Sequence, residues 1–552
     1  MKPSQGNGSK EKRTRTNVKQ SKFGCFTCKK RRIKCDESKP SCLRCLSYNL
    51  SCLGYPRGAP PGPWLDTSSS AVIRSQNRFT HHPNHPWNRY SYLACTVFRQ
   101  GPRRAKSELE AELWSRTIPQ LIHSIPFVRA AAAAFGASYE QHTLRPSRTN
   151  SGLESVQLYC QALRLIQVEV SNLRYGSLPS TVACLLMAFT EVLQQRSDKA
   201  YLHLRGAAVL MVGQGNGSSA AVTQDEGMST LFEKLDLHTA TYVLTRSPGL
   251  PSLHPATPHS MPVSPDRTLY RILHACYHFI STARRYKYTN SSLIPSNILI
   301  EQGRHLGNLK QWLSCHQLDP SRPAADPQNE QLIILRAQSL AGLIHCATVL
   351  QPYETAYDSY GREFKEIIRL AEALSDMQPE VMNSPGHSGD LPHFAPEMGI
   401  IQPLFLTALK YRHPFWRRKA LDLLQKSGRE GPWCGAIEAA VLKVVLEAEE
   451  TTPNNLQGMN GPDQAIFYQP SGVSESQRIH FCWIVGYVSR QQDNRVGMGV
   501  GPGTQAKFAK VQLSKCLDLD GVSSDESRGP CTEFWENQEK WYTWLETVQL
   551  FE

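Results

Sequence analysis

The chain has 552 residues, 40% of them hydrophobic and 20% charged, so it is long enough for several domains and has the composition of a largely globular protein. Its longest apolar runs, such as residues 182–189, fall well short of the ~18 residues that a membrane span requires, so we expect no membrane partner. The net charge of +13 instead favours a polyanionic partner.

The positive charge is concentrated at the N-terminus. Residues 1–60 contain fifteen Lys and Arg but only three acidic residues, so this segment carries +12 of the net charge. Residues 1–24 are polar and basic without the apolar core of a secretory signal, which favours an intracellular chain. We expect a disordered leader there, either merely solvated or used for nuclear import or phosphate binding.

Residues 25–52 contain a repeated cysteine pattern, in which C-x2-C-x6-C occurs twice. Structural zinc takes four ligands, so two zinc ions need eight ligand places, which six cysteines fill only if two of them bridge. The symmetry of the repeat favours the first cysteine of each half, Cys25 and Cys42, as the bridges. The pattern predicts two Zn²⁺ per chain, held by Cys25, Cys28, Cys35, Cys42, Cys45 and Cys52 in a small module of two short helices.

Other interpretations of this cysteine pattern are weaker. A disulfide scaffold requires an extracellular chain, and a redox C-x-x-C motif requires a βαβ context. Metal storage requires more cysteines without a basic insert. The main alternative is a zinc module that binds protein or RNA, and the five positive charges between Cys28 and Cys35 argue against it.

The motif closely resembles the fungal binuclear zinc cluster family of transcription factors. The resemblance includes Lys29-Lys30-Arg31-Arg32-Ile33-Lys34 before the third cysteine and Lys39-Pro40 shortly before the fourth. It implies a nuclear regulator of RNA polymerase II transcription, whose partners are double-stranded DNA and the transcription machinery. It also implies bridging by Cys25 and Cys42 and a turn at Pro40.

The two halves of the repeat differ in chemistry. The first predicts a basic helix that faces DNA, and the second, with Leu43, Leu46 and Leu50, an apolar helix that supports it. In the family, residues late in the first helix recognise a CGG triplet, and guanine offers two acceptors to Arg or Lys in the major groove. The matching residues are Arg31 and Arg32 with Lys34, whereas the expected phosphate contacts are Lys22, Lys29, Lys30 and Arg44.

Residues 53–105 are rich in Pro, Ser and His and predict a linker. Many family members dimerise through a coiled coil at this place. Leu53, Leu65, Val72 and Ile73 form no heptad pattern, so the usual dimer geometry is not expected, although a homodimer stays open.

Residues 106–492 predict a large all-α domain of packed helix pairs. Apolar residues recur every three or four positions in several segments, which is typical of amphipathic helices. The expected helices cover residues 153–170, 182–193, 200–211, 228–246, 266–287, 328–352, 358–376, 399–427, 434–449 and 478–491.

Part of this region also resembles the fungal-specific regulatory domain that follows such clusters. The resemblance runs from Trp114 to Met211 and includes residues 127–132, Tyr159 and the segment 203–207. It implies a domain that senses a signal or a partner and does not catalyse a reaction.

The sequence contains no recognisable catalytic motif. The glycine-rich segments 213–217 and 497–503 lack the strand-to-helix context of a phosphate-binding loop, so we interpret them as loops. Cysteines outside the repeat, such as Cys160, Cys184 and Cys346, are interpreted as small core residues. We therefore expect that the chain is not an enzyme.

Residues 493–552 combine a glycine-rich loop with an acidic, aromatic C-terminal segment. Mixed acidic and aromatic residues are typical of activation segments. The spacing of Trp541, Leu545 and Val548 instead favours a terminal helix docked on the core, and we prefer this second interpretation.

Overall fold

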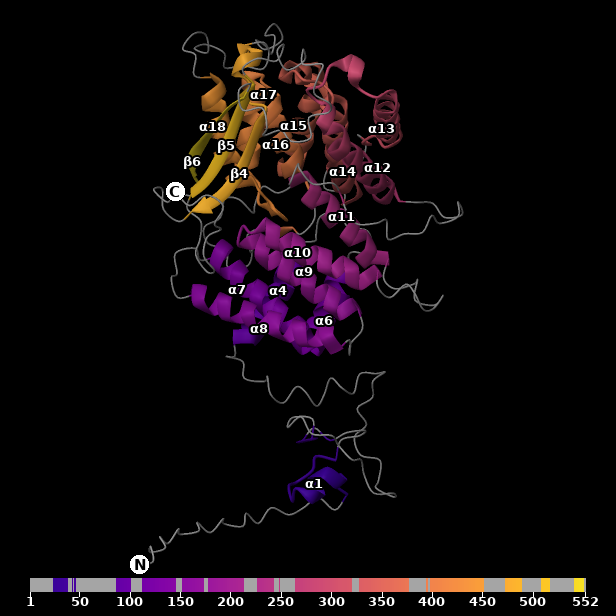
Figure 1. Ribbon diagram of the computed structural model, residues 1–552, viewed down its shortest axis with the longest axis vertical. Helices are drawn as coiled ribbons and strands as arrows, with labels where there is room; N and C mark the ends of the chain where they lie inside the picture. Colours follow the sequence, from indigo (N-terminus) through magenta and orange to yellow (C-terminus); the bar gives the residue numbers. More distant parts are fainter. Residues whose placement is uncertain are drawn as a thin grey trace, which may run out of the picture. The chain divides into compact units, whose positions relative to one another are not determined.

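The structure is a computed structural model, which describes part of the chain (Figure 1). The chain divides into two compact units, Met1–His85 and Pro86–Glu552. The described residues are 23–37, 42, 44–45, 86–100, 112–144, 151–172, 177–212, 226–242, 248, 264–319, 327–376, 394–395, 398–450, 472–488, 508–516 and 541–550.

Among the described residues of the first unit, the buried core consists of cysteine side chains. One short helix, α1 (Phe26–Lys30), begins at Cys25, and residues 44–45 are also helical. Ile33 packs against the buried cysteines. Most of the expected second helix, including Leu46 and Leu50, lies outside the described residues, as do Cys52 and the leader up to Lys22.

The second unit is predominantly helical, as expected. Its helices are α4 (Pro86–Gln100), α6 (Ile118–Ser124), α7 (Pro126–Tyr139), α8 (Ser151–Asn172), α9 (Ser177–Leu193), α10 (Ser197–Val212), α11 (Glu226–Tyr242), α12 (Pro265–Ala283), α13 (Ser296–Cys315), α14 (Pro327–Thr348), α15 (Gly361–Asp376), α16 (Ile401–Lys410), α17 (Pro414–Lys426) and α18 (Gly435–Glu450). Two π-helical turns, η3 (Leu113–Thr117) and η4 (Glu140–Leu144), flank α6 and α7, and the 3-10 turns are η6 (Arg284–Tyr286), η7 (Ser291–Leu293), η8 (Glu354–Tyr360) and η11 (Glu475–Gln477).

Helix α7 lies at the centre of the first hydrophobic core, in contact with α4, α8 and α9. Its sequence, PFVRAAAAAFGASY, begins with a proline, which suits the first helical position, and its alanines let neighbouring helices approach closely. A Cβ at Gly136 would lie 2.1 Å from the carbonyl oxygen of Tyr90 in α4, so only glycine fits there. The sequence resemblance to the regulatory domain included this alanine-rich helix.

Helix α4 differs from the sequence-based expectation, because it lies within the segment 53–105 that we interpreted as a linker. Tyr90, Ala94 and Phe98 are buried, and the ring of Phe98 stacks on Phe135 of α7 at 4.8 Å. The prolines and histidines before residue 86 obscured this amphipathic pattern. The part of the chain that forms the helical unit therefore begins earlier than expected.

The later helices form two further cores, and most expected segments are confirmed there. Helices α12, α13 and α14 pack together in one core, and α14 to α18 contribute to the other. The expected helix 399–427 is two helices, because Pro414 disfavours helical backbone at His413 and starts α17. The sequence analysis did not predict α13. Its exposed face carries Leu299, Ile300 and two glycines, so polar and apolar residues do not separate into two faces in the sequence.

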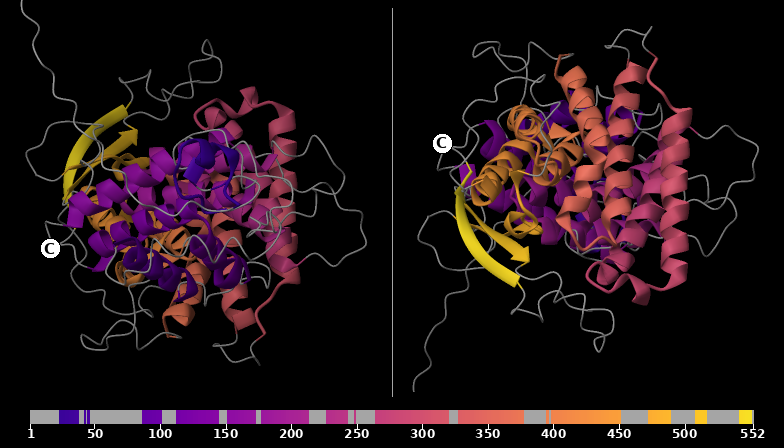
Figure 2. Two further views of the ribbon diagram at one scale, coloured as in Figure 1. Left: turned by 90° about the horizontal axis from the view of Figure 1, so that it is seen from below. Right: turned by 90° about the horizontal axis from the view of Figure 1, so that it is seen from above.

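Two small sheets accompany the helices, so the expectation of a purely α-helical domain needs correction. One sheet contains β1 (Phe394–Ala395), β2 (Arg429–Glu430) and β3 (Trp433–Cys434). The other is antiparallel in the order β4 (Phe481–Val488), β5 (Phe508–Cys516), β6 (Trp541–Gln549), with a bulge between Ile484 and Gly486. It lies at one edge of the unit, and α12 to α14 lie at the opposite edge (Figure 2).

The segments 478–491 and 541–549 were expected to be helical, and both expectations are wrong. β4 is rich in aromatic and β-branched residues that favour strands, and β6 is similarly rich in Trp, Tyr, Thr and Val. In β6 the degree of exposure alternates from Trp544 to Gln549, with Val548 buried and Leu545 exposed, so the spacing of three and four residues does not reflect a helix. The C-terminal segment does dock on the core, but as a strand.

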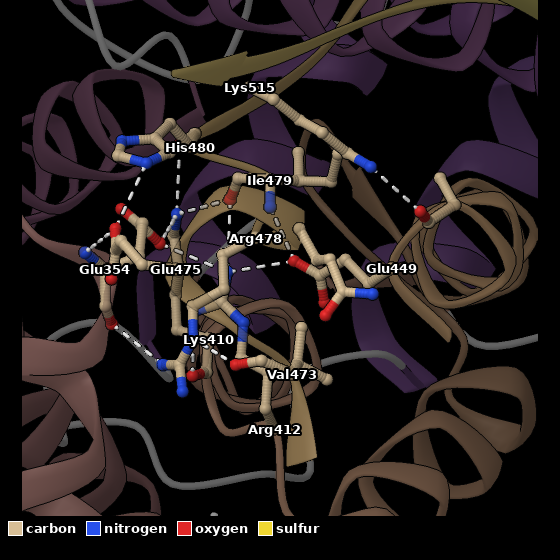
Figure 3. A network of polar contacts seen from close by, with 12 residues as sticks. Glu354, Lys410, Arg412, Glu449, Val473, Glu475, Arg478, Ile479, His480 and Lys515 are labelled. Atoms are coloured by element: carbon tan, nitrogen blue, oxygen red, sulfur yellow. Dashed lines mark hydrogen bonds and ion pairs between the residues drawn. The ribbon is translucent and has the colours of Figure 1, made fainter. Parts of the chain in front are cut away.

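A network of buried ion pairs and hydrogen bonds connects the segment before β4 to the helices (Figure 3). Glu354 in η8 accepts hydrogen bonds from Lys287 at 3.2 Å, Lys410 at 2.7 Å and Arg412 at 3.2 Å. Burial opposes the charged form of this carboxyl, but Lys410 and Lys287 hold its pKa well below the ordinary value.

Glu449 at the end of α18 forms the second centre of this network. Its carboxylate pairs with Arg412 at 3.0 Å and Arg417 at 2.7 Å, and it accepts the backbone N–H of Ile479 at 2.6 Å. Burial disfavours the carboxylate, yet the two guanidinium groups lower the pKa of Glu449 to about 2. The sheet is thus tied to α16, α17 and α18 through charges that have almost no access to water.

Among the described residues, no single helix is long and apolar enough to cross a membrane. One pair of consecutive helical segments is long and apolar enough when taken together, but the two segments meet at an angle of 114°; they are Leu113–Ser124 and Pro126–His142.

Candidate metal centre and nucleic-acid interface

Helix α1 is fixed at its start by two cysteines. The sulfur of Cys25 accepts the backbone N–H of Cys28 at 3.3 Å, which caps the helix. After the helix, the N–H of Ile33 bonds to the carbonyl of Cys28 at 3.2 Å, which brings the chain back toward Cys35. Cysteine positions thus determine where the basic segment between them lies.

Four sulfur atoms form a group that fits one tetrahedral zinc ion. The sulfurs of Cys25, Cys28, Cys35 and Cys42 all lie within 4.8 Å of one another, and all four residues are buried. Zn–S bonds of about 2.3 Å in a tetrahedron separate the sulfurs by about 3.8 Å. The Sγ–Sγ distances from Cys42 to Cys25 and to Cys28 are both 3.5 Å.

Cys45 adds a fifth sulfur to this group. Its Sγ lies 3.7 Å from that of Cys25, and its backbone N–H donates to the sulfur of Cys42 at 3.3 Å. The sulfur of Cys28 also lies 3.9 Å from that of Cys45, so all five sulfurs form one group, in which Cys25 and Cys42 have the shortest distances to the others. Cys52 lies outside the described residues.

The environment of the thiols is suited to a cation. Burial disfavours the thiolate of Cys35, but the N–H groups of Cys25 and Glu37 donate to its sulfur, and its pKa is lowered. The pKa of Cys42 is raised by burial and by the neighbouring sulfurs, since crowded thiolates repel one another. A divalent cation removes this repulsion, because zinc binds the thiolate form.

The basic residues of the first half all project away from the sulfur core. Lys29, Lys30, Arg31, Arg32 and Lys34 are exposed, as is Arg44 in the second half. Lys22 lies outside the described residues. The cluster thus presents five positive charges on or just after one rigid helix.

Arg32 has an unusual backbone conformation, with φ of 54°. This left-handed conformation ends α1 and lets Ile33 turn inward while Arg31, Arg32 and Lys34 stay outside. Sequence reasoning identified Arg32 by its position in the motif but had no signal for this turn.

Asp36 is a site residue that the sequence analysis missed. Its carboxylate accepts the backbone N–H of Arg44 at 3.0 Å, where the second helical segment begins. A carboxylate often caps the start of a helix, but the capping residue usually lies next to that helix in sequence. Asp36 lies eight residues before Arg44, so the sequence did not mark it as a cap. Its position directly after Cys35 was the available hint.

The remaining cysteines are mainly structural. Cys184 and Cys346 are buried in helices, as expected, whereas Cys160 is exposed on α8, so its assignment to the core was wrong. Within the described ranges, the group of cysteines at residues 25–42 is the one arrangement of His, Cys, Asp and Glu side chains close enough to hold a metal ion. The loops 213–217 and 497–503 lie outside the described residues.

Comparisons with known proteins agree with this geometry. Residues 23–60 match the family model of the fungal Zn(2)-Cys(6) binuclear cluster domain, and residues 105–441 match the fungal specific transcription factor domain. No solved structure is significantly similar to the chain.

Curated relatives are fungal regulators. The chain is 27% identical over 230 residues, 39% of each chain, to an uncharacterized transcriptional regulatory protein of Schizosaccharomyces pombe. It is 42% identical over 134 residues to the pestheic acid cluster transcriptional regulator 3 of Pestalotiopsis fici, covering 24% of this chain and 20% of the relative. It is 45% identical over 59 residues to an aspercryptin biosynthesis cluster-specific transcription regulator of Emericella nidulans, covering 9% and 10%.

The matched parts thus span well under half the length of these relatives. The two family models, however, cover the cysteine module and more than half of the chain. The chain belongs to the fungal transcription factors that combine a binuclear Zn(2)-Cys(6) cluster, which binds two zinc ions, with a fungal specific transcription factor domain.

Proposed function

We propose that this chain is a sequence-specific DNA-binding regulator of RNA polymerase II transcription that reads CGG-type sites. The observation that carries the proposal is the group of sulfurs around which α1 exposes Lys29 and Lys30, and the turn after it exposes Arg31. A basic helix held by metal ligands can enter the major groove with little loss of backbone conformational entropy on binding.

The zinc ligands divide into two sets. Cys25, Cys28, Cys35 and Cys42 hold the first ion, and Cys42, Cys45, Cys52 and Cys25 hold the second, so that Cys25 and Cys42 bridge. The short sulfur distances around Cys25 and Cys42 support the bridging role. Zinc supplies the folding energy that so small a module lacks.

The basic residues divide into base readers and phosphate contacts. Arg32, Arg31 and Lys34 contact guanine N7 and O6, since they lie at the end of α1 where the turn projects them outward. Lys22, Lys29, Lys30 and Arg44 neutralise phosphates and make binding dependent on salt.

The helical unit, which begins at Pro86 and so extends beyond the residues 106–492 expected from the sequence, acts as a non-catalytic regulatory domain in a nuclear protein. Two relatives are named as regulators of biosynthetic clusters, which supports control of a metabolic or biosynthetic gene cluster. A homodimer on paired CGG sites would not use a coiled coil next to the cluster.

Genome-wide mapping of bound sites, combined with expression of the nearby genes after deletion of the gene, tests this function. We expect bound sites enriched in CGG triplets beside genes whose expression changes. A chain with Cys42→Ser serves as the control and should occupy none of these sites. Binding that persists in this control, or bound sites without the triplet, would contradict the proposal.

A further inference from the structure

The first unit exposes one large apolar side chain on its basic helix. Phe26 begins α1 and keeps 47% of its surface exposed, whereas Ile33, the other large apolar residue of the basic half, packs against the cysteines. Isolated exposed apolar residues are common on proteins, so the position of Phe26 is the informative feature.

Phe26 shares a helix face with two of the proposed DNA contacts. Residues three and four apart in a helix are neighbours, so Phe26, Lys29 and Lys30 lie on one side of α1. All three are exposed. Phe26 is held between two buried cysteines, Cys25 and Cys28, so its backbone cannot shift independently of the cluster.

The major groove offers one apolar group to such a ring, the 5-methyl group of thymine. Phe26 lies five residues before Arg31, the first residue proposed to read the triplet, which is about 7.5 Å along the axis of α1 at ~1.5 Å per residue. Bases along a strand are spaced by ~3.4 Å, so this offset corresponds to about two base pairs beside the triplet.

We propose that Phe26 is a further specificity-determining residue, which recognises a thymine methyl next to the triplet in the major groove. This inference rests on the proposed function, because it requires α1 to lie in the groove. It adds a preference for thymine that the basic residues do not supply, since their donors are directed at guanine and phosphate.

Substitution of thymine by uracil tests the contact, because the two bases differ only in this methyl group. The full chain is loaded with zinc, and the tightest duplex from a random pool is the parent, so the test does not presuppose CGG. Each thymine of that duplex is then replaced by uracil, one at a time. Burial of one methyl group predicts about a fourfold loss of affinity at one position near the triplet.

The variants Phe26→Ala and Phe26→Leu are measured on the same duplexes. Phe26→Ala should bind the thymine and uracil duplexes equally, whereas Phe26→Leu should keep part of the difference. Both should retain two zinc ions and the preference for the triplet over a scrambled sequence. The proposal is overturned if no uracil substitution weakens the wild type, or if Phe26→Ala keeps the full difference. Loss of the triplet preference in the wild type would instead overturn the proposed function.

Discussion

At the scale of single residues, the side chain of Arg32 is the most informative one in the cluster. Its left-handed backbone turns Ile33 inward and leaves the guanidinium outside. Asn tolerates this conformation better than most residues, so Arg32→Asn removes the charge while preserving the turn.

We expect Arg32→Asn to cost about 1–3 kcal/mol of binding free energy at a CGG site and to leave non-specific binding nearly unchanged. Lys22→Ala, a proposed phosphate contact, should weaken all duplexes alike and reduce the salt dependence by about one charge. Titration of each variant against a CGG duplex and a scrambled duplex at two salt concentrations measures both effects. If Arg32→Asn lowers the affinity for both duplexes equally, Arg32 contacts phosphates and does not read the bases.

Glu438 in α18 gives a prediction about pH. This buried carboxyl has no ion-pair partner among the described residues, and its Oε1 atom has no hydrogen bond. Burial raises its pKa to about 8, only partly offset by Arg429, and the neighbouring groups from other elements are Tyr242, Tyr487 and Cys482.

The raised pKa of Glu438 means that the folded protein binds a proton that the unfolded chain releases above its ordinary pKa of about 4.3. The contribution of Glu438 to the free energy of unfolding is therefore fully present below that pH, and it is lost as the pH rises toward about 8. Glu438→Gln should make the protein more resistant to thermal unfolding than the wild type at pH 8 and have little effect at pH 5. Glu447→Gln, on the exposed side of the same helix, should change neither. Equal destabilisation by Glu438→Gln at both pH values would contradict the raised pKa.

At the scale of secondary-structure elements, the buried charges around Glu449 connect α18 to α17, to Arg412 before α17, and to the segment before β4 (Figure 3). Removal of one partner leaves an uncompensated charge away from water. We expect Glu449→Ala to lower the free energy of unfolding by about 3–5 kcal/mol, measured by denaturant titration. Asp422→Ala breaks an exposed pair with Lys426 and should cost less than about 1 kcal/mol. Similar effects of the two variants would show that the network is not a stabilising connection.

The accuracy of sequence-based prediction also differs between elements. Helices such as α9 and α15 were predictable because their apolar pattern is continuous and long. The strands β4 and β6 were not, because each has only eight or nine residues and pairs with β5, which is distant in sequence, so no local pattern marks them as strands. The residues of the charge network come from five distant segments, so no local pattern marks them.

The metal centre was predictable for a different reason. Its ligands lie within 28 residues of sequence, and thiolate spacing alone constrains the number of ions. The turn at Arg32 and the cap provided by Asp36 depend on backbone geometry, which the cysteine spacing does not encode.

At the scale of the whole molecule, the proposed binding to DNA depends on the zinc cluster. Purified protein should contain two zinc ions per chain. Cys25→Ser or Cys42→Ser should remove both, because each of these residues is proposed to bridge. Cys52→Ser should remove one first, and Cys184→Ser, a buried cysteine in α9, should remove neither. A content of one zinc ion in the wild type would contradict the bridged arrangement.

Binding of the full chain to a CGG duplex, with and without a chelator, tests the central claim most directly. The same measurement uses a second duplex in which 7-deazaguanine removes the N7 acceptors of the triplet. The proposed function predicts tight binding to the normal duplex, loss of binding on chelation with recovery when zinc is restored, and markedly weaker binding to the modified duplex. Binding that is unaffected by the chelator, or equal for the two duplexes, would contradict it.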